Sequence, residues 1–143
     1  GNNIDNQGDM STIIGGTSNS IAAATNASII GGRNNNIDIN ANNSIILGGT
    51  GNDISGANSL AFGLSNTVTS ANSVGIGSSV TASGVGTWAL GNGSQSNDVK
   101  ALSIGNISTA GGKYSFSIGF IFHSSSKFLI CLFNESAFIL SNT

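Results

Sequence analysis

The most informative feature of this sequence is a short apolar phrase that ends in glycine and recurs at a constant interval. Five copies, at residues 59–63, 73–77, 87–91, 101–105 and 115–119, read S-L-A-F-G, S-V-G-I-G, T-W-A-L-G, A-L-S-I-G and S-F-S-I-G. Three looser copies stand upstream, and the interval between their second glycines is slightly longer. The closing glycines are Gly16, Gly32, Gly49, Gly63, Gly77, Gly91, Gly105 and Gly119. A fixed period over most of a chain is the signature of a stacked repeat architecture.

Each of the five evenly spaced copies contains two apolar residues, three and one positions before the glycine. A spacing of two predicts a β-strand with one buried face. The predicted core residues are Leu60, Phe62, Val74, Ile76, Trp88, Leu90, Leu102, Ile104, Phe116 and Ile118. A weaker apolar position five residues after most of the glycines, such as Ile37 or Val68, predicts a second short strand. The sequence therefore predicts an all-β fold, a parallel β-roll or β-solenoid with rungs of about 14 to 17 residues and glycine at a positive-φ corner.

Composition excludes several other classes. Ser, Gly and Asn number 24, 21 and 20 among 143 residues, but a hydrophobic share of 38% with regular spacing argues against disorder. Four cations and a net charge of −2 give no basic surface for phosphate backbones, so no nucleic-acid partner is expected. The longest apolar run, residues 128–133, is too short for a transmembrane helix.

A lone solenoid built from such thin rungs is expected to be only marginally stable. About three modest side chains per rung, each contributing roughly 1.5 to 3 kcal/mol, hardly offset the ordering of fourteen residues at about 1 to 2 kcal/mol each. Self-association that buries the second face of the strands would correct the deficit, and three-fold symmetry is one closed solution among several.

Residues 58–63 (N-S-L-A-F-G), 72–77 (N-S-V-G-I-G) and 87–94 resemble the N-S-V-A-I-G-x-x-S head repeats of YadA-type trimeric autotransporter adhesins. The upstream copy at 31–37, G-G-R-N-N-N-I, is similar to a G-G-x-x-N-x-I variant found in phage and large-virus fibre proteins. The resemblance covers about residues 11 to 119. It implies a left-handed homotrimeric head, attachment to surfaces or receptors, an extracellular or cell-surface location, and no cofactor.

The same alignment predicts three regions: a lead-in at 1–10, the β-roll repeat domain at 11–123, and an apolar cap or tail at 124–143. The upstream spacings of 16 and 17 predict inserted turn residues and looser rungs, and Ser96 stands where a small apolar residue is expected. The Phe-rich end matches no part of the adhesin family. A cap, a partner-binding strand pair and a truncated end all remain open for it.

No catalytic, cofactor-binding or metal site is predicted. Residues 48–54, G-G-T-G-N-D-I, resemble one calcium-binding nonapeptide, but calcium needs six to eight oxygens from adjacent turns and no second copy follows. His123 is the only histidine and Cys131 the only cysteine, and Cys131 lies in an apolar run typical of packing. Trp88 is interpreted as a core or inter-chain packing residue rather than a sugar platform.

Two functional hypotheses follow. The first is a non-enzymatic, homotrimeric adhesin or fibre head that attaches to a host surface or matrix receptor. The second is a structural or receptor-binding fibre protein of a phage or large-virus virion, with other virion subunits as partners. A β-helical polysaccharide enzyme is disfavoured because ten charged residues spread over eight rungs form no charged groove, and an ice-binding face is disfavoured because threonine is too irregular.

Overall fold

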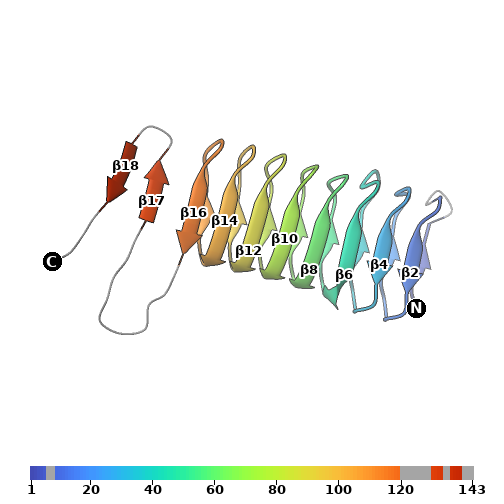
Figure 1. Ribbon diagram of the computed structural model, residues 1–143. Helices are drawn as coiled ribbons and strands as arrows, with labels where there is room; N and C mark the ends of the chain where they lie inside the picture. Colours follow the sequence, from blue (N-terminus) through green and yellow to red (C-terminus); the bar gives the residue numbers. More distant parts are fainter. Residues whose placement is uncertain (6–8, 120–129, 134–135, 140–143) are drawn as a thin grey trace.

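The computed structural model is a rod of stacked rungs, as Figure 1 shows, and it describes residues 1–5, 9–119, 130–133 and 136–139. The described residues contain strands and turns but no helix. Parallel strands stack into a β-solenoid of about eight turns, which confirms the predicted fold class.

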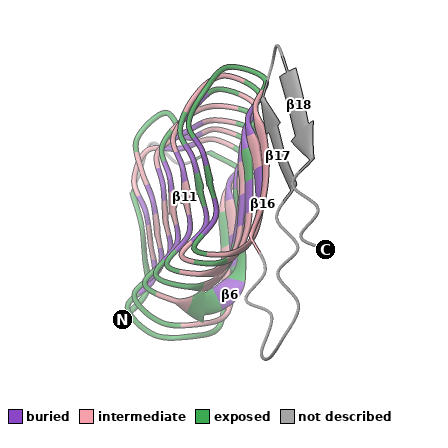
Figure 2. Cartoon of the chain, turned by 90° about the vertical axis from the view of Figure 1, so that its left-hand side faces the viewer, coloured by how far each residue is buried: buried purple, intermediate pink, exposed green. Residues whose placement is uncertain are grey.

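Each rung contributes one short strand to an eight-stranded sheet and one longer strand to a ten-stranded sheet. The short strands are β1 (Asn3–Ile4), β3 (Ser20–Ile21), β5 (Asn36–Ile37), β7 (Asp53–Ile54), β9 (Thr67–Val68), β11 (Thr81–Ala82), β13 (Gln95–Ser96) and β15 (Thr109–Ala110). The longer strands are β2 (Thr12–Ile14), β4 (Ser28–Ile30), β6 (Ile45–Thr50), β8 (Leu60–Leu64), β10 (Val74–Ser78), β12 (Trp88–Asn92), β14 (Leu102–Asn106) and β16 (Phe116–Gly119). Viewed near the rod axis in Figure 2, the two sheets form opposite walls of a narrow interior.

Hydrogen bonds between neighbouring rungs hold the stack together. The Leu60 amide donates to the Ser73 carbonyl at 3.0 Å, and the Val74 amide donates to the Thr87 carbonyl at 2.8 Å. Equivalent residues of successive rungs are therefore partners in the sheet. Val74 pairs with Leu60 on one side and with Trp88 on the other.

The extra residues of the upstream rungs occupy two defined places. One is the double glycine at the end of the long strand, where the register between β6 and β8 shifts between Ile46 and Gly49. The other is the turn after the short strand, where the additional residues include exposed Ile39 and Asn40. The sequence predicted looser rungs here, and Ala24 and Ala41 of these turns are fully buried.

The interior of each rung differs from the predicted core. The residues between the predicted pairs point inward, and Ala61, Ala89 and Ser103 are fully buried. The ten residues predicted to form the core, Leu60, Phe62, Val74, Ile76, Trp88, Leu90, Leu102, Ile104, Phe116 and Ile118, are half-buried or exposed on the outer surface of the longer strands. The alternation along the strand was predicted correctly, but the opposite face is buried, because in these rungs the two walls leave room only for a small side chain on the longer strand.

The buried face of the shorter strands matches the second apolar position of the repeat. Ile21, Ile37, Ile54, Val68, Ala82 and Ala110 are buried. Ser96 is buried in the same row, and its hydroxyl donates to the Trp88 carbonyl at 2.7 Å. That bond explains how a serine is accommodated where a small apolar residue was expected.

Seven of the eight repeat glycines have a positive φ, from +76° at Gly16 to +138° at Gly77, while Gly119 does not. At Gly77 a Cβ atom would overlap the carbonyl oxygen of Gly91 in the next rung. Both the backbone conformation and the rung spacing therefore require glycine at this corner.

Strand pairing describes both ends of the rod. β1 pairs in parallel with β3, so the solenoid already includes Asn3–Ile4 within the region predicted as a lead-in. At the other end β17 (Ile130–Phe133) pairs antiparallel with β16, and β18 (Ser136–Ile139) pairs antiparallel with β17. The predicted boundary at residue 123 lies outside the described residues.

The glycine corner gives a direct test. Gly77→Ala introduces a left-handed alanine and a backbone overlap, and we expect it to lower the free energy of unfolding by about 3 kcal/mol, measured by urea denaturation at fixed protein concentration. Gly111→Ala is the matched control, because a Cβ there meets nothing within 4 Å. Equal stability of the two variants would contradict the corner's role.

Candidate association surface

The outer face of the longer strands carries two continuous rows of apolar side chains. Strand pairing aligns the first row, Ile45, Leu60, Val74, Trp88, Leu102 and Phe116. It also aligns the second row, Phe62, Ile76, Leu90, Ile104 and Ile118. We refer to these eleven residues as the apolar face.

Large side chains of this face are open to solvent in the isolated chain. Phe62 is 48% exposed and Trp88 is 53% exposed. Ile14, Ile30 and Leu47 extend the exposed apolar surface onto the upstream rungs. Scattered exposed apolar residues are ordinary, whereas a contiguous apolar strip along a whole sheet marks an interaction surface.

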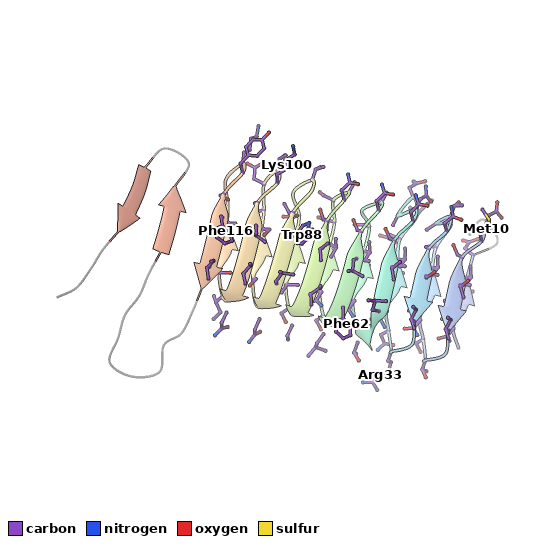
Figure 3. All side chains as sticks on the ribbon, in the orientation of Figure 1. Met10, Arg33, Phe62, Trp88, Lys100 and Phe116 are labelled. Carbon is purple, nitrogen blue, oxygen red and sulfur yellow. The ribbon has the colours of Figure 1, made fainter. Side chains whose placement is uncertain are left out.

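No charged residue interrupts the outer face of the longer strands from β2 to β16. Figure 3 shows Phe62, Trp88 and Phe116 along the sheet drawn in front, while Arg33 and Lys100 lie at its opposite margins. The Lys100 ammonium lies 5.6 Å from the centre of the Tyr114 ring in the turns. Because the charges remain at the margins, the face can pack against an apolar surface without burying an unpaired charge.

The outer face of the shorter strands is polar. Its first outward row consists of Ser20, Asn36, Asp53, Thr67, Thr81, Gln95 and Thr109. Asn36 Nδ2 donates to Asp53 Oδ1 at 2.8 Å, so these two side chains are partners. The rod therefore has one apolar and one polar outer wall.

A buried row of asparagines keeps the upstream rungs in register. Asn35 Oδ1 accepts from the Asn52 amide at 3.0 Å and from Asn52 Nδ2 at 3.1 Å. Asn52 Nδ2 also donates to the carbonyls of Gly48 and Gly63, at 3.0 and 2.8 Å. Asn19 and Asn66 occupy the same position in their rungs, and Val80 and then Ser94 replace asparagine further along. We call Asn19, Asn35, Asn52 and Asn66 the asparagine ladder.

A second buried row consists of Ser44, Ser59, Ser73 and Thr87, at the entry to each longer strand. The Ser59 hydroxyl accepts from the Ser73 amide at 3.1 Å and donates to the Ser70 carbonyl at 3.1 Å. The hydroxyls of Ser44, Ser59 and Ser73 each link their own rung to the next, whereas the Thr87 hydroxyl donates to the Gly84 carbonyl of its own rung at 2.7 Å. These rows fix the strand spacing on which the two outer faces depend.

The structure places the other residues singled out in the sequence as follows. Asp53, from the calcium-like segment, lies on the polar wall beside Asn36, and the described residues contain no cluster of three or more His, Cys, Asp or Glu side chains. His123 lies outside the described residues. Cys131 lies on β17, for which the structure describes the backbone pairing with Ser117.

The asparagine ladder gives a second test. Asn52→Ala removes the bonds to three rungs and leaves buried carbonyls without a donor, so we expect the free energy of unfolding to fall by about 2 to 3 kcal/mol. Urea denaturation of Asn97→Ala provides the control, since Asn97 is exposed and accepts one side-chain bond, at 3.3 Å from Ser83. A loss at Asn52 no larger than at Asn97 would show that the ladder contributes little.

Comparison with known proteins gives no family assignment: no family model matches the chain, and the comparison with curated proteins found no significant relative. Within the described part of the chain, no helix meets the length and apolarity needed to cross a membrane.

Proposed function

We propose that the chain is the head of a non-enzymatic, homotrimeric adhesin or fibre that attaches to a host or other surface outside the cell. Three copies meet through the apolar face, and their polar walls point outward. The observation that carries the proposal is the unbroken apolar face on one wall of a rod whose opposite wall is polar.

The apolar face supports parallel association about an axis along the rod. Its two rows repeat with the rung spacing, so identical rungs of neighbouring copies lie opposite one another in a closed cyclic assembly. Three flat walls around one axis give every copy two neighbours and leave none of the three faces in water. The resemblance of residues 58–94 to YadA-type head repeats supports the same number of copies.

The polar wall supports attachment by many weak contacts. Its threonine, serine, asparagine and glutamine side chains both donate and accept hydrogen bonds, and they recur along the rod at the strand spacing of about 4.8 Å. Trimeric display multiplies the affinity of each weak contact, since a tethered second contact forms at high effective concentration. Attachment of this kind needs no pocket, cofactor or catalytic group.

The self-association is tested by mass. Light scattering of the wild-type chain should give about three times 14.2 kDa. Replacing two exposed aromatic residues of the face, as Phe62→Ser with Trp88→Ser, should dissociate the assembly because apolar contact drives it. Ile107→Ser serves as control, since Ile107 is 74% exposed but lies in a turn. A wild-type mass of 14.2 kDa would contradict the proposal.

Attachment is tested by immobilising matrix proteins and cell-surface glycans and measuring retention of the wild-type chain. The dissociated Phe62→Ser, Trp88→Ser variant should bind a retaining surface about 10² to 10⁴-fold more weakly through loss of multivalency. A trimeric variant with a charged polar wall, Thr69→Lys, Gln95→Lys and Thr109→Lys, should also lose binding, because all three side chains are exposed. Undiminished retention of both variants would contradict attachment through the polar wall.

A further inference from the structure

The two ends of the solenoid bury very different interiors. In the upstream rungs the inward apolar residues of both sheets are isoleucines, among them Ile29 and Ile46 on the longer strands and Ile37 and Ile54 on the shorter strands. In the downstream rungs they are Ala89 with Ser96 and Ser103 with Ala110, all buried. An isoleucine removes several times more apolar surface from water than an alanine or a serine. The interior therefore becomes thinner along the chain.

The outer face of the longer strands carries apolar side chains in both parts of the rod. The outward positions are Ser28 and Ile30 on β4, Ile45 and Leu47 on β6, Trp88 and Leu90 on β12, and Leu102 and Ile104 on β14. The largest apolar side chains of the downstream rungs thus lie outside the rung. The change from large to small inward residues takes place across β8 to β11, where Ala61 and Val68 are followed by Gly75 and Ala82.

At Gly75 the interior has no space for a side chain on the longer strand. A Cβ at Gly75 would lie 2.8 Å from Val68 Cγ2 and 3.4 Å from Val80 Cγ2. The valine side chains already occupy the space in which an inward side chain of β10 would lie. A larger apolar residue cannot be placed inside this rung, so its additional burial has to come from the outer face.

We infer that the downstream rungs, residues 88–118, fold only when copies of the chain associate through the apolar face, whereas the upstream rungs, residues 28–54, fold in the isolated chain. The inference rests on the proposed self-association and specifies where it acts. The occupant of the downstream face is a second and third copy of the same chain. The face carries no charge, and its apolar rows match their own repeat in a neighbouring parallel copy.

Hydrogen exchange measured by mass spectrometry on the whole chain tests the inference. Exchange of residues 28–54 and 88–110 is followed while wild-type protein is diluted through its dissociation range. We expect protection of 88–110 to fall at least 100-fold on dissociation while protection of 28–54 is retained, because only the upstream interior is independent of neighbours.

Two dissociating variants separate assembly from local damage. Trp88→Ser with Leu102→Ser lies within the downstream rungs, and Phe62→Ser with Val74→Ser lies before them. Both should remove protection from residues 88–110. Ile30→Ser is the matched control on the same wall, 46% exposed in an upstream rung, and should leave the trimer and the protection of both regions unchanged.

The outcomes distinguish the two proposals. Dissociated chains that protect both regions equally would overturn assembly-coupled folding and leave the trimeric head intact. Loss of protection confined to the variant substituted within the downstream rungs would also overturn it, since the cause would be local. A wild-type chain that stays monomeric at every concentration would contradict the proposed function itself.

Discussion

The structure depends on hydrogen bonding between consecutive rungs. A rung contains little regular hydrogen bonding of its own, and nearly every strand amide donates to a carbonyl of an adjacent rung. Buried backbone groups need such partners, so every rung must present its groups at the spacing of its neighbours. The positive-φ glycines, the asparagine ladder and the buried hydroxyl row all serve that single requirement.

The same requirement explains why the interior is narrow. Closing two strands and two turns within so short a repeat brings the walls close together, and Gly75 and Ser103 show how little fits between them. Large apolar side chains in such a rung have only the outer face available. A rung of this kind is therefore either larger, with an isoleucine interior, or smaller, with its large apolar side chains outside, where the proposed self-association would bury them.

The period and the strand positions could be predicted from the sequence, because both follow from recurring residues. Which face of the longer strands is buried could not be derived from alternation alone, since Leu60 and Phe62 share a face whether it points inward or outward. The residue between Leu60 and Phe62 decides which face is buried. Ala61, Gly75 and Ala89 are small in successive rungs, and small residues belong where two walls nearly touch.

The spacing of the asparagine ladder can also be found in the sequence. Asn19, Asn35, Asn52 and Asn66 each follow the repeat glycine by three residues, but the abundance of Asn throughout the chain hides this spacing. Each of them is buried at a glycine corner that brings carbonyls of two adjacent rungs within reach of one amide, with either a double glycine before Asn52 or a single glycine before Asn66. That geometry becomes evident only when the rungs are stacked.

The change in repeat length at Gly49 has a consequence for how copies align. Five successive rungs of equal length would tolerate a neighbour displaced by one rung, since sliding by one repeat restores nearly the same side chains. The upstream rungs end in two glycines and have longer turns, and β6 shifts register against β8. A displaced neighbour would place a long rung beside a short one. In the proposed trimer, the irregular upstream rungs would therefore allow only one axial alignment of the three copies.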